Sequence, residues 1–275
     1  MHPGWLVPGR VVSTGRATPG AVPDADVDEA LAAGVGAVMT TRQGGVSRAP
    51  WQTMNVGAAV GDEAAAVAAN RALFARAIGA VPVWLRQVHG SRVVRVGHAD
   101  AADGAAPPEA DASVTTEAGV ACAVQVADCL PLLFADRGGR AVAAAHAGWR
   151  GLAAGVAERT LQAVCDAASC EPAAVRVWLG ACIGPRRFEV GADVLDAFGG
   201  NPGHGAAGRF VARGAAHPGK WLADLAGLAR DRLTAAGVRD VRGGGWCTVC
   251  DESRFFSFRR DGVTGRMVAA VWIRG

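Results

Sequence analysis

The sequence predicts a single α+β domain (mixed α/β), in which β-sheets are sandwiched between layers of helices. The chain has 275 residues, of which 51% are hydrophobic and 19% charged, so it can bury a large core without disulfides as staples. Short apolar runs alternate with helical patterns, and no break in composition separates them. No glycine motif matches a dinucleotide-binding fold or a phosphate loop, so neither architecture is indicated.

The apolar runs predict the strands. The run at residues 120–135 is interrupted by Asp128 and Cys129, and Pro131 marks a strand end or a bulge because proline donates no ladder hydrogen bond. The expected strands cover residues 35–41, two short segments within 83–96, then 120–135, 140–145, 175–179, 238–246 and 266–273.

Helical periodicity predicts three helices, and two stretches predict loops. Residues 62–79 place Val67, Phe74 and Ile78 on one face, and Gly79 follows as a typical C-terminal stop. The other expected helices cover residues 152–168 and 222–236, and the expected loops cover residues 99–110 and 199–219.

Residues 1–35 differ from the rest because they are rich in glycine, proline and alanine and have weak periodicity. We expect them to form an N-terminal extension with one or two edge strands. The main domain then covers residues 36–275. No linker-like boundary stands out within it, so we expect one domain there and not two.

Charge and cysteine content exclude several partners. The net charge is only +3 and Lys220 is the only lysine, so the abundant arginine reflects a composition bias and does not indicate nucleic-acid binding. No apolar run reaches the roughly 18 residues of a membrane span, and the N-terminus lacks a signal-peptide pattern. Seven irregularly spaced cysteines indicate a reducing compartment. We expect a cytoplasmic monomer without nucleic-acid or membrane partners.

Three residues with metal-binding side chains lie at the ends or breaks of apolar strands, next to small residues. They are His89, Cys129 and His146. Two imidazoles and a thiolate suit zinc, and three protein ligands leave a fourth position for water or substrate, as in catalytic sites. Their spacing matches no zinc finger or ribbon, so Cys129 as a small buried hydrophobic residue stays an alternative.

Further candidates lie next to these ligands or in arginine-glycine segments. Asp128 is a candidate for orienting a ligand or for acid–base chemistry, and equally for a turn residue. A guanidinium beside exposed backbone N–H groups suits an anion such as phosphate, although such turns are also common in solvated loops. The candidates of this second kind are Arg42, Gly44, Gly45 and Arg150.

Cys247 and Cys250 form a CxxC motif, which is typical of half a zinc ribbon or of a redox pair. The sequence contains no second CxxC motif to complete a ribbon. We therefore expect two buried cysteines in a strand turn.

Several motifs occur together in an order typical of one protein family. They are TRQGGVS (41–47), NVG (55–57), QVHG (87–90), ADCLP (127–131), HAGWRG (146–151) and FSFRR (256–260). Over roughly residues 36–273 the chain resembles the laccase-domain or multicopper polyphenol oxidase family, whose members are now regarded as purine nucleoside phosphorylases. ADCLP and HAGWRG together are highly specific.

The resemblance implies a zinc site made by His89, Cys129 and His146, and a single domain with β-sheets sandwiched between helical layers. It implies phosphorolysis of adenosine, inosine and methylthioadenosine, a transferase activity that needs inorganic phosphate. Adenosine deamination, a hydrolase activity, is reported beside it. Asn55, from NVG, joins the candidates for binding substrate or phosphate. The chain departs from its relatives at residues 187–188, where it has arginine and phenylalanine and they tend to have cysteine and tyrosine.

We expect metal-assisted phosphorolysis, in which the three ligands and Asp128 form the catalytic centre and Arg42 holds the attacking phosphate. Zinc is the expected cofactor, with copper as the alternative. Three rivals stay open. A copper-dependent polyphenol oxidase would use the same ligands, although the six histidines include no His-x-His pair. A metal-free cysteine hydrolase would use Cys129 as its nucleophile, and a structural zinc domain would need a fourth ligand.

Overall fold

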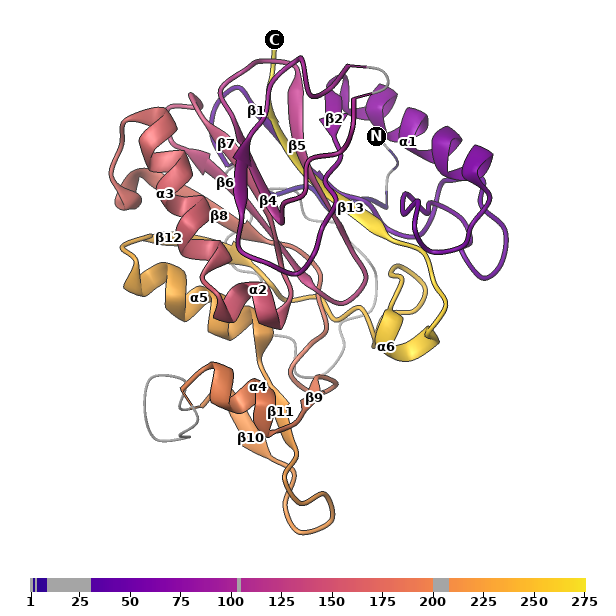
Figure 1. Cartoon of the computed structure of the whole chain (residues 1–275), viewed down its shortest axis with the longest axis vertical. Helices are drawn as coiled ribbons and strands as arrows, with labels where there is room; N and C mark the ends of the chain where they lie inside the picture. Colours follow the sequence, from indigo (N-terminus) through magenta and orange to yellow (C-terminus); the bar gives the residue numbers. More distant parts are fainter. Residues whose placement is uncertain (1, 3, 9–30, 103–104, 200–207) are drawn as a thin grey trace.

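The computed structural model describes residues 2, 4–8, 31–102, 105–199 and 208–275. It has the expected mixed α/β architecture, with two stacked β-sheets between helical layers (Figure 1). One long helix covers the outer face of the smaller sheet, and three helices cover the outer face of the larger one. The predicted fold class is therefore confirmed.

The smaller sheet has four strands and places the C-terminal strand in its middle. Its order is β1 (Val35–Met39), β13 (Met267–Ile273), β5 (Val120–Val126) and β2 (Val81–Val83). The β13 strand pairs antiparallel with both of its neighbours, and β2 runs parallel to β5.

The larger sheet has six strands and supplies two of the predicted metal ligands. Its order is β12 (Asp240–Gly243), β8 (Val175–Leu179), β6 (Leu130–Asp136), β7 (Val142–Ala147), β4 (Ala112–Thr115) and β3 (Val93–Arg95). Cys129 immediately precedes β6, and His146 lies in β7 opposite Pro131 of β6. The pairing of β6 with β7 thus brings these two ligands to the same end of the sheet.

The space between the two sheets is a continuous apolar core. Cys122 and Val124 of β5 face Val142 and Ala144 of β7 within it, while the alternate residues of both strands face the helices. Strands covered on both faces form nearly continuous apolar runs, which explains why these segments were easy to predict.

The helices begin and end at recognisable residues. The helix predicted at residues 62–79 ends at Gly79, which is left-handed at φ 65°. The helices of the two outer layers are α1 (Ala64–Ile78) over the smaller sheet and α2 (Trp149–Ala153), α3 (Val156–Ala168) and α5 (Leu225–Ala235) over the larger one.

Two helix predictions need correction. The expected helix at 152–168 is divided in two, because Gly155 is left-handed at φ 88° and separates α2 from α3. The expected helix at 222–236 begins later, because the Asp224 carboxylate accepts the N–H of Gly227 (2.9 Å) and caps α5. Leu222 belongs instead to a strand.

A small third sheet projects from the main body and was not predicted (Figure 1). Its strand β10 (Phe210–Ala212) lies inside the expected loop 199–219, of which residues 200–207 are outside the described part. The sheet order is β10, β11 (Trp221–Ala223) and β9 (Glu189–Val190), with α4 (Ala192–Ala197) beside it. The short helices α6 (Phe258–Asp261) and η1 (Pro172–Ala174) were also not predicted.

The expected N-terminal extension is described only in part. Leu6 pairs antiparallel with Met39 through two N–H···O bonds of 2.8 Å, which adds one residue to the open edge of β1. Most of the segment in which further edge strands were expected, residues 9–30, lies outside the described residues. Within the described ranges, no helix is long and apolar enough to cross a membrane.

A buried asparagine fastens the loop before α1 to that helix. The Asn70 side chain is fully buried, and its oxygen accepts the N–H of Val46 (2.9 Å). Its NH2 group donates to the Ser47 hydroxyl and to the carbonyls of Thr53 and Asn55. The loop that carries Arg42, Gly44 and Gly45 is therefore anchored through one amide group.

Replacing this amide should destabilise the protein. We expect Asn70→Ala to lower the free energy of unfolding by roughly 3 kcal/mol, because it leaves several buried polar groups without partners. Denaturant unfolding would measure the change. Gln162→Ala is the matched control, since Gln162 is exposed and bonds only Asp166 in its own helix, and should change stability by less than about 0.5 kcal/mol. Equal effects of the two substitutions would contradict this role of Asn70.

Candidate metal centre

The structure brings the three predicted ligands together. One ligand atom from each of His89, Cys129 and His146 lies within 4.8 Å of the other two. Cys129 Sγ is 3.8 Å from His89 Nε2, and the two imidazole rings lie edge to face with centroids 4.7 Å apart. The ligands come from the segment between β2 and β3, the turn between β5 and β6, and the end of β7.

The backbone around the ligands is unusual. His89 (φ 61°) and Asp128 (φ 90°) are left-handed, a conformation that residues other than glycine rarely adopt unless their surroundings hold them. Gly148 is needed for a different reason, since a Cβ there would lie 3.0 Å from both Cys129 Sγ and His89 Cδ2. Any side chain at this position would push the ligands apart.

A fully buried carboxylate, Asp111, organises two of the three ligands. It accepts backbone N–H groups from Val88 (3.2 Å), His89 (2.9 Å) and Gly90 (2.7 Å). Its Oδ1 also lies 2.8 Å from His146 Nδ1. Because an ionised carboxylate can only accept, Nδ1 carries the proton and Nε2 is the nitrogen available to a metal.

The role of Asp111 was missing from the sequence prediction. In the sequence, Asp111 is visible only as an acidic residue just before a short, mostly apolar segment. An acidic residue before a strand is usually a turn residue, and the four hydrogen bonds come from segments distant in the sequence. Full burial of an aspartate is the signal of its importance, and burial follows from the fold.

Electrostatic interactions couple the ligands. Burial raises the pKa of Cys129, but the neighbouring His146 and His89 outweigh this and lower it from 9.0 to about 6. Burial lowers the pKa of His146, but Cys129 and Asp111 outweigh this and raise it from 6.5 to about 9. Burial likewise opposes ionisation of Asp111, yet hydrogen bonds from His146 and Gly90 bring its pKa below the ordinary value. Both shifts favour the ionised forms, a thiolate beside an imidazolium, in the metal-free centre.

These residues fit a transition metal. A thiolate and two imidazole nitrogens are the donor set of zinc and also of some copper sites. The carboxylate behind His146 is the partner that commonly fixes a metal-binding histidine. His89 is exposed, which leaves the centre accessible from solvent.

Asp128 lies beside the centre and is held by two bonds. The Thr248 hydroxyl donates to Oδ1 (2.5 Å), and the Arg259 backbone N–H donates to Oδ2 (2.6 Å). The Asp128 carbonyl accepts the N–H of Ile183. Asp128 therefore ties the turn that carries Cys129 to the C-terminal part of the chain.

The candidate phosphate-binding loop lies against the C-terminal segment. The Arg42 guanidinium donates to the carbonyls of Gln52 and Glu252 (both 3.1 Å) and lies over the Phe256 ring. Burial, and then the charge of Arg260, lower the pKa of Arg42.

The two glycines of this loop allow backbone conformations and close contacts that other residues would not. Gly44 is left-handed at φ 93°, and a Cβ at Gly45 would collide with the Thr53 carbonyl. Both glycines are thus required by the shape of the turn, whatever the loop binds.

The candidates Asn55 and Arg150 differ in their exposure to solvent. The Asn55 side chain is fully buried, and all its bonds are internal: to Gly57, to Asp62 and from the N–H of Arg266. Arg150 is exposed, and its guanidinium lies over the ring of Trp149, 4.3 Å from the centroid.

The prediction of two buried cysteines in the CxxC motif was wrong. Cys250 is exposed, while Cys247 is half-buried and its Sγ accepts the N–H of Gly184 (3.3 Å). Partial burial raises the pKa of Cys250, but hydrogen bonds with Cys247 and Arg187 outweigh this effect and lower it below the usual value. Arg187, the residue that departs from the family pattern, therefore contacts Cys250.

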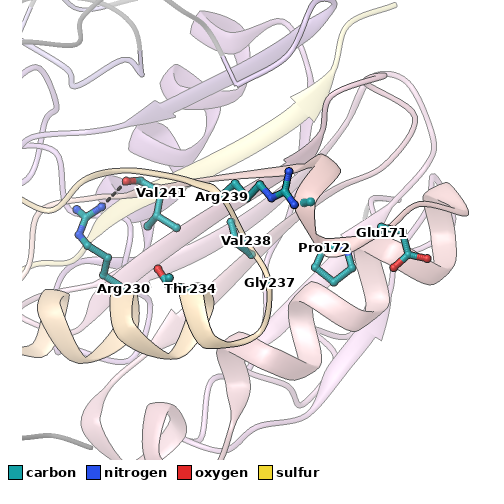
Figure 2. Close-up of a pocket in the computed structure, with 9 residues that line it drawn as sticks. Glu171, Pro172, Arg230, Thr234, Gly237, Val238, Arg239 and Val241 are labelled. Carbon is teal, nitrogen blue, oxygen red and sulfur yellow. Dashed lines mark hydrogen bonds between the residues drawn. The ribbon is translucent and has the colours of Figure 1, made fainter.

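A hollow in the described surface lies away from these residues, at the far end of α5 (Figure 2). The Arg230 guanidinium donates hydrogen bonds there to the carbonyls of Val241 and Gly243, and so holds α5 against β12. The hollow is also lined by Glu171, Pro172 and Thr234 and includes none of the metal ligands.

The bonds of Asp111 predict its effect on metal binding. We expect Asp111→Asn to weaken zinc binding by about 10- to 100-fold, because the amide lacks the charge that holds His146 and can accept fewer bonds. Competition with a chromogenic chelator would measure the affinity, and circular dichroism would confirm folding. Asp193→Asn, at an exposed position on α4, is the control. An unchanged affinity in a folded Asp111→Asn variant would contradict the role of Asp111.

The pKa of Cys129 predicts a metal-dependent reactivity. In chelated protein at pH 7 we expect rapid alkylation of Cys129, slowing as pH falls below about 6, because its pKa of about 6 makes it a thiolate above that pH. Bound metal should protect it. Peptide mass spectrometry would compare it with Cys122, whose burial raises its pKa to about 12 and keeps it unreactive in both states. Equal alkylation of Cys129 with and without metal would rule out coordination.

Known proteins match this chain over most of its length. The family model described as multi-copper polyphenol oxidoreductase laccase matches residues 36–274. A purine nucleoside phosphorylase of Pseudomonas aeruginosa is 48% identical over 244 residues, covering 87% of this chain and 94% of that protein. Purine nucleoside phosphorylase YfiH of Escherichia coli is 45% identical over 242 residues, which cover 87% of this chain and 94% of that protein.

Solved structures agree with these matches. A Neisseria meningitidis protein superposes with a TM-score of 0.82 at 47% identity, covering 90% of this chain and 98% of its own. YlmD of Geobacillus stearothermophilus superposes with a TM-score of 0.83 at 34% identity, and the match covers 90% of this chain and 95% of YlmD. With its His–Cys–His cluster in place and nearly the whole chain matched, this protein belongs to the multi-copper polyphenol oxidoreductase laccase family, which includes relatives named purine nucleoside phosphorylase.

Proposed function

We propose that the protein is a zinc-dependent purine nucleoside phosphorylase that cleaves adenosine, inosine and methylthioadenosine. Adenosine deamination would be a second activity of the same site, and the protein would act in the cytoplasm as a monomer. The observation that carries the proposal is the accessible His–Cys–His cluster in a chain 48% identical to a protein with that name.

His89, Cys129 and His146 would hold the zinc ion. When bound, the ion supplies positive charge that stabilises the negative charge developing on the departing purine. Asp111 keeps the Nδ1 proton of His146 in place and so presents Nε2 to the site. Metal uptake by the thiolate–imidazolium pair would release a proton.

The substrates would be held by residues around this cluster. Arg42 and the nearby N–H groups of Gly44 and Gly45 are our candidates for binding phosphate, since a guanidinium beside turn N–H groups suits an anion. The Gly45 N–H donates to the Thr53 hydroxyl (3.1 Å) and would have to exchange that bond for one to phosphate. Arg150 stays a candidate from the sequence alone. Asn55 would act by shaping the loop, because its side-chain bonds are internal.

Asp128 would act mainly by holding its neighbours. Both of its carboxylate oxygens accept a short hydrogen bond, one from Thr248 and one from Arg259. A carboxylate held in this way would keep the turn that carries Cys129 in one orientation.

Two other functions are favoured by specific observations. The family description favours a copper oxidoreductase acting on phenols, which would use the same ligands. The order Asp111–His146–Cys129, with a thiolate beside an imidazolium, favours a metal-free cysteine hydrolase. Oxygen uptake with a phenol would support the first, and full activity after chelation the second.

Phosphate-dependent release of the free base is the direct test. We expect the zinc-loaded protein to convert adenosine to adenine only when phosphate is present, and Cys129→Ala to lower kcat/KM by about 100-fold or more because the metal is lost. Coupled assays and metal analysis would measure both. Cys170→Ala, which removes a half-buried thiol after α3, should leave the rate unchanged. Undiminished turnover in Cys129→Ala would refute the metal-dependent mechanism.

A further inference from the structure

We propose that Phe258 is the platform on which the purine base stacks at the rim of the metal centre, an inference that rests on the proposed function. Its side chain is 57% exposed. Every other phenylalanine and tryptophan in the sequence falls within the described ranges and is buried or half-buried. An exposed aromatic side chain that packs against no core is more typical of a binding surface than of a stabilising contact.

The position of Phe258 follows from a hydrogen bond beside the centre. The backbone N–H of Arg259 donates to Asp128 Oδ2 (2.6 Å), and Asp128 immediately precedes Cys129. The peptide bond that joins Phe258 to Arg259 therefore lies against the turn that carries the thiolate. Helix α6 begins here, on the lower right flank of the main body (Figure 1).

One face of the Phe258 ring is already covered. The guanidinium of Arg266 lies over it, 5.8 Å from the centroid. Arg266 is fixed, because its Nη1 donates to the carbonyls of Thr264 and Gly265 and its backbone N–H donates to Asn55. A ring held by a fixed cation on one side and exposed elsewhere can accept a flat partner on its open face.

Burial lowers the pKa of Arg266, the cation over the ring, and the negative charges of Cys129 and Asp128 oppose this shift. Val88, next to His89, also has an exposed apolar side chain. An aromatic ring on the segment bonded to Asp128 and an aliphatic side chain beside His89 are the kinds of group that line a site for a heteroaromatic ligand.

The same segment reaches the candidate phosphate residue. The ring of Phe256, two residues before Phe258, lies under Arg42 with 4.9 Å from the guanidinium to the centroid. Phosphate at Arg42 and a base on Phe258 would therefore be positioned by one short stretch of chain. Stacking needs only a π face, so adenine and hypoxanthine would be accepted alike.

Substitution of Phe258 in the zinc-loaded full-length chain tests this assignment. We expect Phe258→Ala to raise the KM for inosine and adenosine by about tenfold or more, with KM for phosphate and zinc content unchanged, because only base stacking is lost. Phe258→Trp should retain near-normal KM values, and Phe258→Leu should resemble Phe258→Ala. Val211→Ala, which trims a side chain 61% exposed on β10, is the control.

A second measurement separates this inference from the proposed function. Calorimetric titration with adenosine in the absence of phosphate reports binding without turnover. Weaker binding by Phe258→Ala supports the platform even if the wild-type protein shows no phosphorolysis, which would refute the proposed function alone. Normal phosphorolysis with unchanged nucleoside KM in Phe258→Ala overturns the platform alone. Full affinity in Phe258→Leu also overturns it, because a general apolar contact would then be sufficient.

Discussion

Asp111 joins two segments of the chain that would otherwise move independently. It accepts three N–H groups from the turn that carries His89, and the Nδ1 proton of His146 at the end of β7. A buried carboxylate is costly unless its lone pairs are occupied, so these bonds form together or not at all. The spacing between the two histidines, and with it the candidate metal centre, depends on this one group.

The rest of the architecture delivers these groups to the same place. Pairing of β6 with β7 sets Cys129 near His146, and the left-handed Asp128 turns the chain so that the thiol faces both imidazoles. Bonds from Thr248 and Arg259 then fix that turn from the C-terminal side. The apolar core between the sheets supports these segments, and the candidate ligands lie in turns and near the end of a strand.

The sequence predicted those parts whose signals are local. Apolar runs located the strands of both large sheets except the four-residue β4, and breaks within them located the three candidate metal ligands. The third, three-stranded sheet was missed because its strands are only two or three residues long, too short to show a periodic pattern in the sequence. Asp111 and Phe258 were missed for a related reason: burial of the first and exposure of the second are properties of the folded chain. Gly155 was overlooked because a glycine inside a helical pattern is often tolerated.

The three ligands also differ in how firmly they are held. His146 is buried and bonded to Asp111, and Cys129 is half-buried in a turn tied down at Asp128, whereas the His89 ring projects from an exposed turn. The side of the centre that faces solvent is therefore the one formed by His89. A metal ion, or a reagent directed at Cys129, would reach the centre past this imidazole.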